Sequence, residues 1–353
     1  MNKVCLGDVA FEHKETCKGS KNNYPVVGLE HLVPEEVTLS LWDEGSDNTF
    51  TKVFRKGNVL FGRRRAYLKK AAVAPFDGIC SGDITVIEAN ADKIVPELLP
   101  FIIQNDALFD FAIEKSAGSL SPRVKWEHLR EFEFELPEIS KQKQLAEVLW
   151  AMDTTKKTYQ NLIKSTDELV KSQFIEMFGS ETKRIPGCDY VTLSTLCKSD
   201  SSSISLKNVE GITGKYPLFG ASGFLQYIDT YKMREEYIAI IKDGAGVGRV
   251  YCLPPFSSIL NTMQYILPLP GVNVRYLEHL LRYMDLGSDN TGSTIPHIYF
   301  KDYSLRVVPK PPIERQEQFA AFVRQSDKSK FELEQSLAEL TATYKRIISE
   351  NLG

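Results

Sequence analysis

The sequence predicts an α+β protein in which two similar strand-rich domains are each followed by a long helix. Two long runs contain no interior proline: one covers 142–178, and the other begins after Pro312 and continues to residue 353. Residues in the two runs match at a constant offset of 174: Gln142 with Gln316, Gln144 with Gln318, Ala146 with Ala320 and Asp153 with Asp327. Self-similarity at a fixed offset indicates a duplicated architecture.

The length of 353 residues is sufficient for two ordinary domains. We predict a first domain over 1–140, a first long helix over 141–180, a second domain over 181–312 and a second long helix over 313–353.

Composition indicates an ordinary soluble protein of the cytoplasm. Hydrophobic residues make up 42% of the chain and charged residues 25%. No apolar run approaches the roughly 18 residues of a membrane span, and the N-terminal residues do not form a signal peptide. The six cysteines include no C-x-x-C pair, so we expect reduced thiols rather than a disulfide or zinc framework. The net charge of −3 argues against a protein that coats nucleic acid non-specifically, although a local basic surface is compatible with it.

In the first domain, 4–10 forms a short opening element, and the apolar run 24–29 follows a polar loop. Short apolar or alternating runs between turn residues predict strands over 58–61, 71–74, 84–87 and 132–136. The apolar pattern of 96–112 predicts one buried helix. Residues 116–123 are expected to form a polar loop. The second half repeats this order, because 216–220 resembles 24–28 and 292–300 resembles 118–126.

The two long helices carry an apolar period of 3.5 residues, which predicts a seam that faces another helix. The apolar seam positions are Leu145, Leu149, Met152, Tyr159, Ile163, Val170, Phe319, Val323, Leu333, Leu337, Leu340, Tyr344 and Ile347. We expect the helices to form an antiparallel coiled coil with a pseudo-twofold axis, in which a rod of about 55 Å holds the domains apart. In the alternative, each seam packs against its own domain.

A basic segment of the first domain is a candidate DNA contact. Residues 51–70 contain eight lysines and arginines and no acidic residue. Arginines at a hairpin tip suit phosphate contacts and bidentate reading of guanine. The predicted DNA-binding residues here are Lys52, Arg55, Arg63, Arg64, Arg65, Tyr67, Lys69 and Lys70. An ordinary solvated basic loop is the alternative.

Polar loops in both halves add to this set. These loops are the matching loops of the two domains, a turn of the second domain and a glycine-rich loop. They supply hydroxyl, imidazole and basic groups, which can reach phosphates or base edges. These predicted contacts are Ser119, Ser121, Arg123, Lys125, Ser222, Lys242, Arg249, Ser293, Thr294, His297 and Tyr299. Singly, each residue is almost as compatible with ordinary turn chemistry.

Three motifs resemble parts of enzymes but lack essential features. The glycine-rich segment 242–249 is followed by a strand-like run, so the helix N-terminus of a phosphate loop is missing. Leu253-Pro254-Pro255-Phe256 has leucine where an adenine methyltransferase needs Asp or Asn, and Glu12-His13-Lys14 lacks a well-placed upstream acid of a nuclease. We therefore expect a non-catalytic chain without a metal site.

The order of domain, proline-led helix, domain and proline-led helix resembles the specificity subunit of type I restriction-modification systems. The motifs that carry the resemblance are Leu136-Pro137 with Gln142-Lys143-Gln144, Pro311-Pro312 with Gln316-Glu317-Gln318, Gly292-Ser293-Thr294-Ile295-Pro296, and Phe54-Arg55-Lys56-Gly57-Asn58-Val59-Leu60-Phe61-Gly62. The resemblance implies two target-recognition domains that each read half of a bipartite double-stranded DNA site. It further implies two methyltransferase (M) subunits and restriction/translocase (R) subunits as partners, with AdoMet, ATP and magnesium bound by those partners and no cofactor by this chain. A type II enzyme subunit and a protein-binding coiled-coil scaffold are the alternatives.

Overall fold

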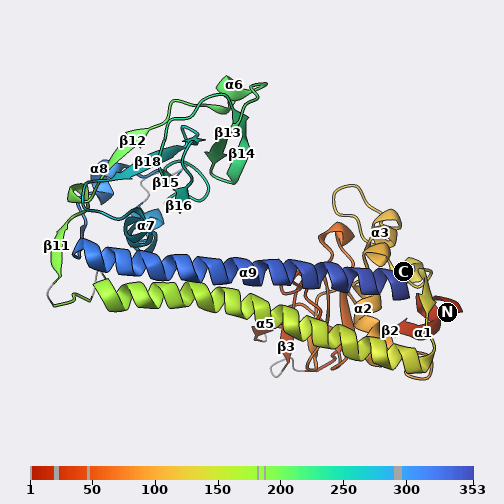
Figure 1. Cartoon of the computed structure of the whole chain (residues 1–353). Helices are drawn as coiled ribbons and strands as arrows, with labels where there is room; N and C mark the ends of the chain where they lie inside the picture. Colours follow the sequence, from red (N-terminus) through yellow and green to blue (C-terminus); the bar gives the residue numbers. More distant parts are fainter. Residues whose placement is uncertain (1, 20–23, 46–47, 181–182, 187, 290–295) are drawn as a thin grey trace. The chain divides into compact units, whose positions relative to one another are not determined.

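The computed structural model describes residues 2–19, 24–45, 48–180, 183–186, 188–289 and 296–353. The chain forms two compact units (Figure 1), and each long helix contributes residues to both. Unit 1 comprises residues 1–160 and 334–353, and unit 2 comprises residues 161–333. In the described part of the chain, no helix combines the length and apolar character needed to cross a membrane.

Unit 1 is built from short strands in three sheets within its described residues. Its terminal strands β1 and β10 pair antiparallel, and two four-stranded sheets have the orders β2-β9-β6-β7 and β4-β3-β8-β5. The strands are β1 (Asn2–Cys5), β2 (Ala10–Glu12), β3 (Pro25–Val27), β4 (Asp43–Glu44), β5 (Lys52–Phe54), β6 (Val59–Gly62), β7 (Ala71–Val73), β8 (Gly78–Cys80), β9 (Ile84–Ala89) and β10 (Glu133–Leu136). The helical elements are α1 (Leu6–Val9), η1 (Ala66–Leu68), η2 (Pro96–Leu98), α2 (Leu99–Ile103), α3 (Asp106–Glu114) and α4 (Trp126–Leu129).

The prediction of one helix over 96–112 is wrong, because the segment divides into η2, α2 and α3. The division falls at Asn105, whose extended backbone ends one helix and whose side chain accepts a hydrogen bond of 3.0 Å from the backbone N–H of Ala107. Asparagine is among the best N-cap residues, so this side chain favours a new helix start. Its amide group also donates to the carbonyl of Leu352 at 3.0 Å, which connects the break to the end of the second long helix.

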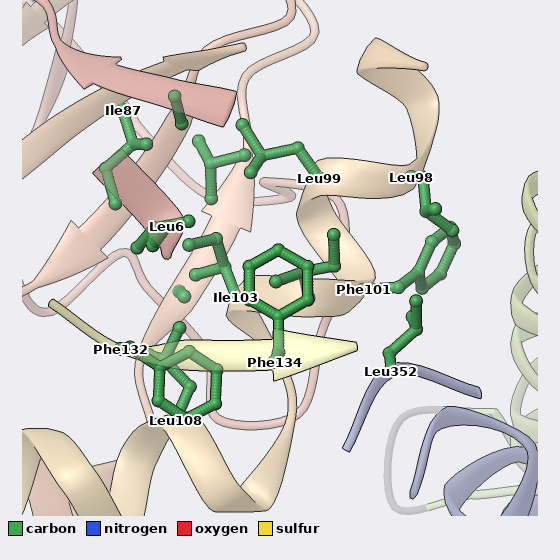
Figure 2. Close-up of a cluster of buried hydrophobic side chains, with 14 of the residues drawn as sticks. Leu6, Ile87, Leu98, Leu99, Phe101, Ile103, Leu108, Phe132, Phe134 and Leu352 are labelled. Atoms are coloured by element: carbon green, nitrogen blue, oxygen red, sulfur yellow. The ribbon is translucent and has the colours of Figure 1, made fainter. Parts of the chain in front are cut away.

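The core of unit 1 lies between its sheets and helices (Figure 2). Leu6, Phe101 and Leu108 are fully buried, and Phe134 from the last strand lies with them. Leu352 joins the same cluster from the second long helix. Residues from both ends of the sequence therefore contribute to one core.

Unit 2 repeats the topology of unit 1. Its sheets are the antiparallel pair β11-β19, the four-stranded β12-β18-β15-β16 and the three-stranded β14-β13-β17. The strands are β11 (Asp189–Thr192), β12 (Cys197–Ser201), β13 (Tyr216–Gly220), β14 (Gly223–Ile228), β15 (Tyr237–Ile241), β16 (Val250–Leu253), β17 (Ser258–Ile259), β18 (Met263–Pro268) and β19 (Val307–Lys310). The helical elements are η3 (Leu193–Thr195), α6 (Leu206–Val209), α7 (Val274–Tyr283), η4 (Leu286–Asp289) and α8 (Phe300–Tyr303).

The pairing of strands shows the duplication directly. In unit 1 β3 runs parallel to β8, and in unit 2 β13 runs parallel to β17. These are the segments around Pro25 and Pro217 that the sequence matched. The terminal pairs β1-β10 and β11-β19 are antiparallel in both units. The predicted α+β fold class with tandem strand-rich domains and two long helices is therefore confirmed.

The long helices α5 (Ile139–Phe178) and α9 (Ile313–Leu352) each contain 40 residues, which corresponds to about 60 Å. Within unit 2 they run antiparallel. Lys330 of α9 donates to the Asp167 carboxylate of α5 at 2.7 Å. Phe178, eleven residues after Asp167, lies edge-on to Phe319, which is eleven residues before Lys330. Later residues of α5 thus meet earlier residues of α9.

All thirteen seam residues are shielded from solvent to some degree. Five are buried, and these are Leu145, Leu149, Val170, Phe319 and Val323; the other eight are half-buried. The buried seam residues also join the core of the unit that contains them: Leu145 packs in the unit 1 core and Phe319 in the unit 2 core. At these positions the seam therefore contacts both helix and domain, which combines the two packing modes considered from the sequence.

Candidate nucleic-acid interface

In unit 1, the loop after β6 is joined to the polar loop before α4 and to the turn before β9. The Arg63 N–H donates to the Asp83 carbonyl at 3.0 Å, and the Arg63 carbonyl accepts from the Val124 N–H at 3.0 Å. The Arg65 N–H donates to the Pro122 carbonyl at 2.9 Å. We call this arrangement the unit 1 junction. It brings two basic segments together that lie about sixty residues apart in the sequence.

The carboxylate of Asp83 lies at the centre of the unit 1 junction. Arg123 donates to it through Nε at 2.7 Å, and the Arg64 guanidinium lies 3.7 Å away. The hydrogen bond from Arg123, followed by the charges of Arg123, Arg64 and Arg63, holds the pKa of Asp83 below its ordinary value despite partial burial. Arg64 also donates to the Ser121 hydroxyl at 2.5 Å. Asp83 thus orients two guanidinium groups that remain partly exposed.

Further cationic groups surround this centre. The Nε atom of Arg63 is buried and has no hydrogen-bond partner among the described residues. Arg65 is exposed and has a left-handed backbone conformation, with φ of 55°. Lys69 pairs with Asp106 at 2.5 Å, and Lys70 donates to the Leu29 carbonyl at 2.7 Å. The positive charge of the segment is only partly compensated.

Unit 2 contains an equivalent junction between the loop after β15 and the loop before α8. The Lys242 N–H donates to the Thr262 carbonyl at 3.0 Å, and the Lys242 carbonyl accepts from the Ile298 N–H at 3.1 Å. The Gly244 N–H donates to the Pro296 carbonyl at 3.0 Å. These three bonds correspond one to one to those of Arg63 and Arg65. We call this arrangement the unit 2 junction.

The side chains of the unit 2 junction are chemically different from those of unit 1. Asp243 occupies the position of Arg64, and its carboxylate pairs with Nδ1 of His297, which occupies the position of Arg123. The His297 ring lies 4.0 Å from the ring of Tyr299, and the Lys301 amino group lies 5.2 Å over the same Tyr299 ring. The same backbone scaffold therefore presents guanidinium donors in one unit and a carboxylate–imidazole–phenol set in the other.

The glycine-rich loop of unit 2 joins the antiparallel strands β15 and β16 as a hairpin. Gly248 has φ of 85°, and a Cβ atom built there would lie 2.3 Å from the Gly287 backbone nitrogen. Both the conformation and this close approach exclude a side chain at that position. The glycine at 248 is thus explained by packing within unit 2.

Two predicted contacts, Arg55 and Lys52, are engaged by other groups of unit 1. Arg55 precedes β6, at the opposite end of that strand from Arg63, and pairs with the carboxylates of Glu15 and Asp77. Lys52 donates to the Ile84 carbonyl at 2.8 Å. Both cations are thus engaged within unit 1, and their DNA contact stays a prediction without support from the geometry.

The remaining predicted residues are exposed or lie outside the description. Ser119, Lys125 and Arg249 are exposed on loops next to the junctions, and Ser222 is exposed in the turn between β13 and β14. Ser293 and Thr294 lie outside the described residues.

Two junction residues were missed from the sequence. Asp83 and Asp243 were not among the predicted contacts. An acidic residue next to a basic run gives little indication of DNA reading by itself. The signal that could have found both is their position, because each lies in a loop that immediately precedes or follows a buried strand. In the structure these loops face residues 118–126 and 296–300.

Comparison with known proteins agrees with the duplicated architecture. A family model described as "Type I restriction modification DNA specificity domain" matches residues 1–165 and 187–342. The type I restriction enzyme EcoDI specificity subunit of Escherichia coli is 26% identical over 132 residues, which covers 36% of this chain and 29% of that subunit.

Two solved structures share the fold over nearly the whole chain. One, from a study of complex assembly and conformational transition of the type I R-M system, is 22% identical with a TM-score of 0.59, and the match covers 99% of this chain and 97% of the other. The other is the type I restriction-modification S subunit from M. genitalium, which is 14% identical with a TM-score of 0.62 and is matched over 100% of this chain and 96% of its own. At these identities the likeness concerns the fold.

Proposed function

Because this chain belongs to the type I restriction-modification DNA specificity family, we propose that it selects the DNA sequence at which partner subunits act. Each unit reads one half of a bipartite double-stranded target, unit 1 through its junction and unit 2 through the equivalent one. The chain itself carries out no chemistry in this proposal. AdoMet, ATP and magnesium belong to the partner subunits.

The observation that carries the proposal is the correspondence between the two junctions. Three backbone hydrogen bonds recur in both units, while the side chains they present differ in charge and in hydrogen-bonding character. Arg64 and Arg123 offer donors in unit 1, whereas Asp243 offers an acceptor in unit 2. Two domains that read different base sequences require the same backbone scaffold with different side chains.

The chemistry of each junction suits a different base edge. Guanidinium groups pair bidentately with guanine O6 and N7 in the major groove and also bind phosphates. A carboxylate accepts from the exocyclic amine of cytosine. We therefore expect the half-site of unit 1 to depend on guanine or phosphate contacts, and the half-site of unit 2 to include a base that donates to Asp243.

The helices α5 and α9 are proposed to fix the length of the unspecified gap between the half-sites. Half-sites read from one face of B-DNA lie roughly 34 Å apart, about one helical turn. Two continuous helices of 40 residues are stiff enough to hold such a spacing.

The outer surface of α5 is the proposed docking site for M subunits. Leu162 and Leu169 are about half exposed and seven residues apart, so they lie on one face of the helix. Exposed apolar side chains at this spacing suit another helix. Two M subunits, joined by R subunits in the full complex, complete the proposed assembly.

Sequencing of modified bases tests this function. DNA from a host that carries this chain together with its M subunit should show methylation at one motif of two short defined segments with a fixed unspecified gap. The same host without this chain should show no methylation at that motif. Methylation at the motif that persists after removal of the chain would refute the proposal.

A further inference from the structure

The loop between β6 and β7 exposes two large side chains at its tip. Tyr67 is 54% exposed and Leu68 is 40% exposed, whereas the preceding Ala66 is buried at 2%. The tip is the short 3₁₀ turn η1, which packs against α3 through Ala66. Adjacent exposed apolar side chains at a loop tip often mark a contact surface.

The backbone holds this tip in one conformation. Arg65 and Lys69, which flank the turn, have φ values of 55° and 50°, a left-handed region that residues with side chains rarely adopt. The Leu68 N–H donates to the Arg65 carbonyl and the Lys69 N–H to the Ala66 carbonyl, both at 2.9 Å. Such conformations persist where the surroundings enforce them, and they cluster at functional sites. Binding through Tyr67 and Leu68 therefore costs little conformational entropy, because the backbone of the tip is already ordered.

The charge around the tip favours DNA as its partner. Six cations are contributed by the loop itself and by the neighbouring polar loop: Arg63, Arg64, Arg65, Lys69, Lys70 and Arg123. Within the described residues, the carboxylates that pair with them are Asp83 and Asp106. The excess positive charge lies on both sides of Tyr67 and Leu68 along the chain. Phosphates that flank one base step would meet these cations while the two side chains reach the step between them.

The equivalent loop of unit 2 has no comparable tip. The equivalent loop between β15 and β16 contains Gly244, Gly246 and Gly248, all with positive φ. Its largest apolar side chain, Val247, is half-buried and packs against the unit 2 core. The two units thus differ at their tips as well as at their junctions.

We infer that Tyr67 and Leu68 form a wedge that enters a base step of the first half-site and unstacks it. Apolar and aromatic side chains inserted between bases kink a duplex, and pyrimidine–purine steps yield most readily. Unit 1 therefore selects its half-site partly by the deformability of one step, and the equivalent loop of unit 2 lacks the side chains for this form of reading. This inference rests on the proposed DNA-reading function.

Fluorescent base analogues test the wedge in the complex of the full chain with its M subunit. A duplex with the motif found by modified-base sequencing carries 2-aminopurine or pyrrolocytosine at one position at a time. The M subunit flips the base that it methylates, so positions next to the methylated bases are left out of the comparison. At the remaining positions, binding should raise the fluorescence at one step of the first half-site and at no step of the second. The change Tyr67→Ala with Leu68→Ala should abolish this rise and weaken binding by about tenfold, as loss of aromatic stacking on a base does.

Two further variants separate the wedge from a structural role. Tyr67→Phe keeps the ring and should retain the fluorescence rise. Arg65→Ala removes a cation and should reduce the salt dependence of binding while the rise remains. The unfolding midpoint of each variant in urea shows whether the protein is intact.

The outcomes distinguish the wedge from the proposed function. If the complex does not bind the motif duplex at all, the DNA-reading function itself is refuted. Binding without a rise in the first half-site away from the methylated bases, or with a rise there that persists in the double alanine variant, refutes the wedge alone. If the double alanine variant no longer binds the M subunit but keeps its affinity for DNA, the tip is a protein contact. That outcome also refutes the wedge.

Discussion

Gln142 and Gln316 make the same pair of hydrogen bonds at the start of the two long helices. The side-chain carbonyl of Gln142 accepts from the Val95 N–H at 2.9 Å, and that of Gln316 accepts from the Asn273 N–H at 2.9 Å. Each amide group donates at 2.8 Å to the carbonyl of the proline five residues earlier, Pro137 or Pro311. Both side chains are 1% exposed. Each glutamine thus fastens a long helix to the preceding helical region of its unit.

Replacing either glutamine by leucine should destabilise the unit that contains it. The change leaves a buried carbonyl and a partly buried N–H without a partner, and an unsatisfied buried group costs about 1–3 kcal/mol. Urea unfolding of Gln142→Leu and Gln316→Leu should therefore show a lower midpoint. Because the two sites share no partner, the double variant should lose about the sum of the single effects.

Gln144 and Gln318 provide the matched control, because they repeat at the same offset but are exposed. Gln144→Leu and Gln318→Leu should change stability by less than about 0.5 kcal/mol. Equal effects of Gln142→Leu and Gln144→Leu would contradict the role of the buried glutamines.

Arg64→Ala and Asp243→Ala should alter different half-sites. The two residues occupy equivalent positions in the two junctions, so each change should relax the sequence requirement in the half read by its own unit. The loss of a good base contact corresponds to about 1–3 kcal/mol of discrimination. Methylome sequencing with each variant gives the result, and Arg346→Ala at an exposed position of α9 is the control. Changes in both halves from one substitution would refute independent reading.

His279 should make unit 2 less stable in acid. The side chain is 5% exposed, and burial, followed by the charges of Arg282 and Arg275, lowers its pKa to about 3. The unfolded chain binds a proton near the ordinary histidine pKa, about 6.5, whereas the folded chain does not. Stability is therefore unaffected by His279 above that value and falls as the pH drops from about 6.5 towards 3, by up to about 1.4 kcal/mol per pH unit.

The variant His279→Gln should reduce this dependence. Urea midpoints measured between pH 7.5 and pH 4.5 should decline less steeply in the variant than in the unmodified protein. The groups that face His279 are Tyr283, whose hydroxyl lies 3.2 Å from Nδ1, and the charged Arg275, Arg282 and Asp167. His128→Gln, at an exposed position of α4, is the control. Identical slopes for His279→Gln and the unmodified protein would contradict the buried neutral histidine.

The duplication and the long helices could be predicted because their signals are local and repeated. The glutamines at 142 and 316 mark the helix starts, and the seam follows a strict period. The division of 96–112 could not be predicted, because it depends on Asn105. The side-chain amide of this residue donates a hydrogen bond to the carbonyl of Leu352, nearly 250 residues later in the sequence. Asp83 was missed for a similar reason: its role arises from Arg64 and Arg123, which meet only in the folded chain.

The spacing role of the helices is tested most directly by lengthening both. Seven residues, one heptad, inserted after Gln160 in α5 and after Leu333 in α9 preserve the seam and add about 10 Å to each helix. Modified-base sequencing should then show the same two half-sites separated by a gap that is longer by up to about three base pairs. An unchanged gap, or altered bases in either half-site, would contradict the proposal that these helices measure the distance between two independent readers.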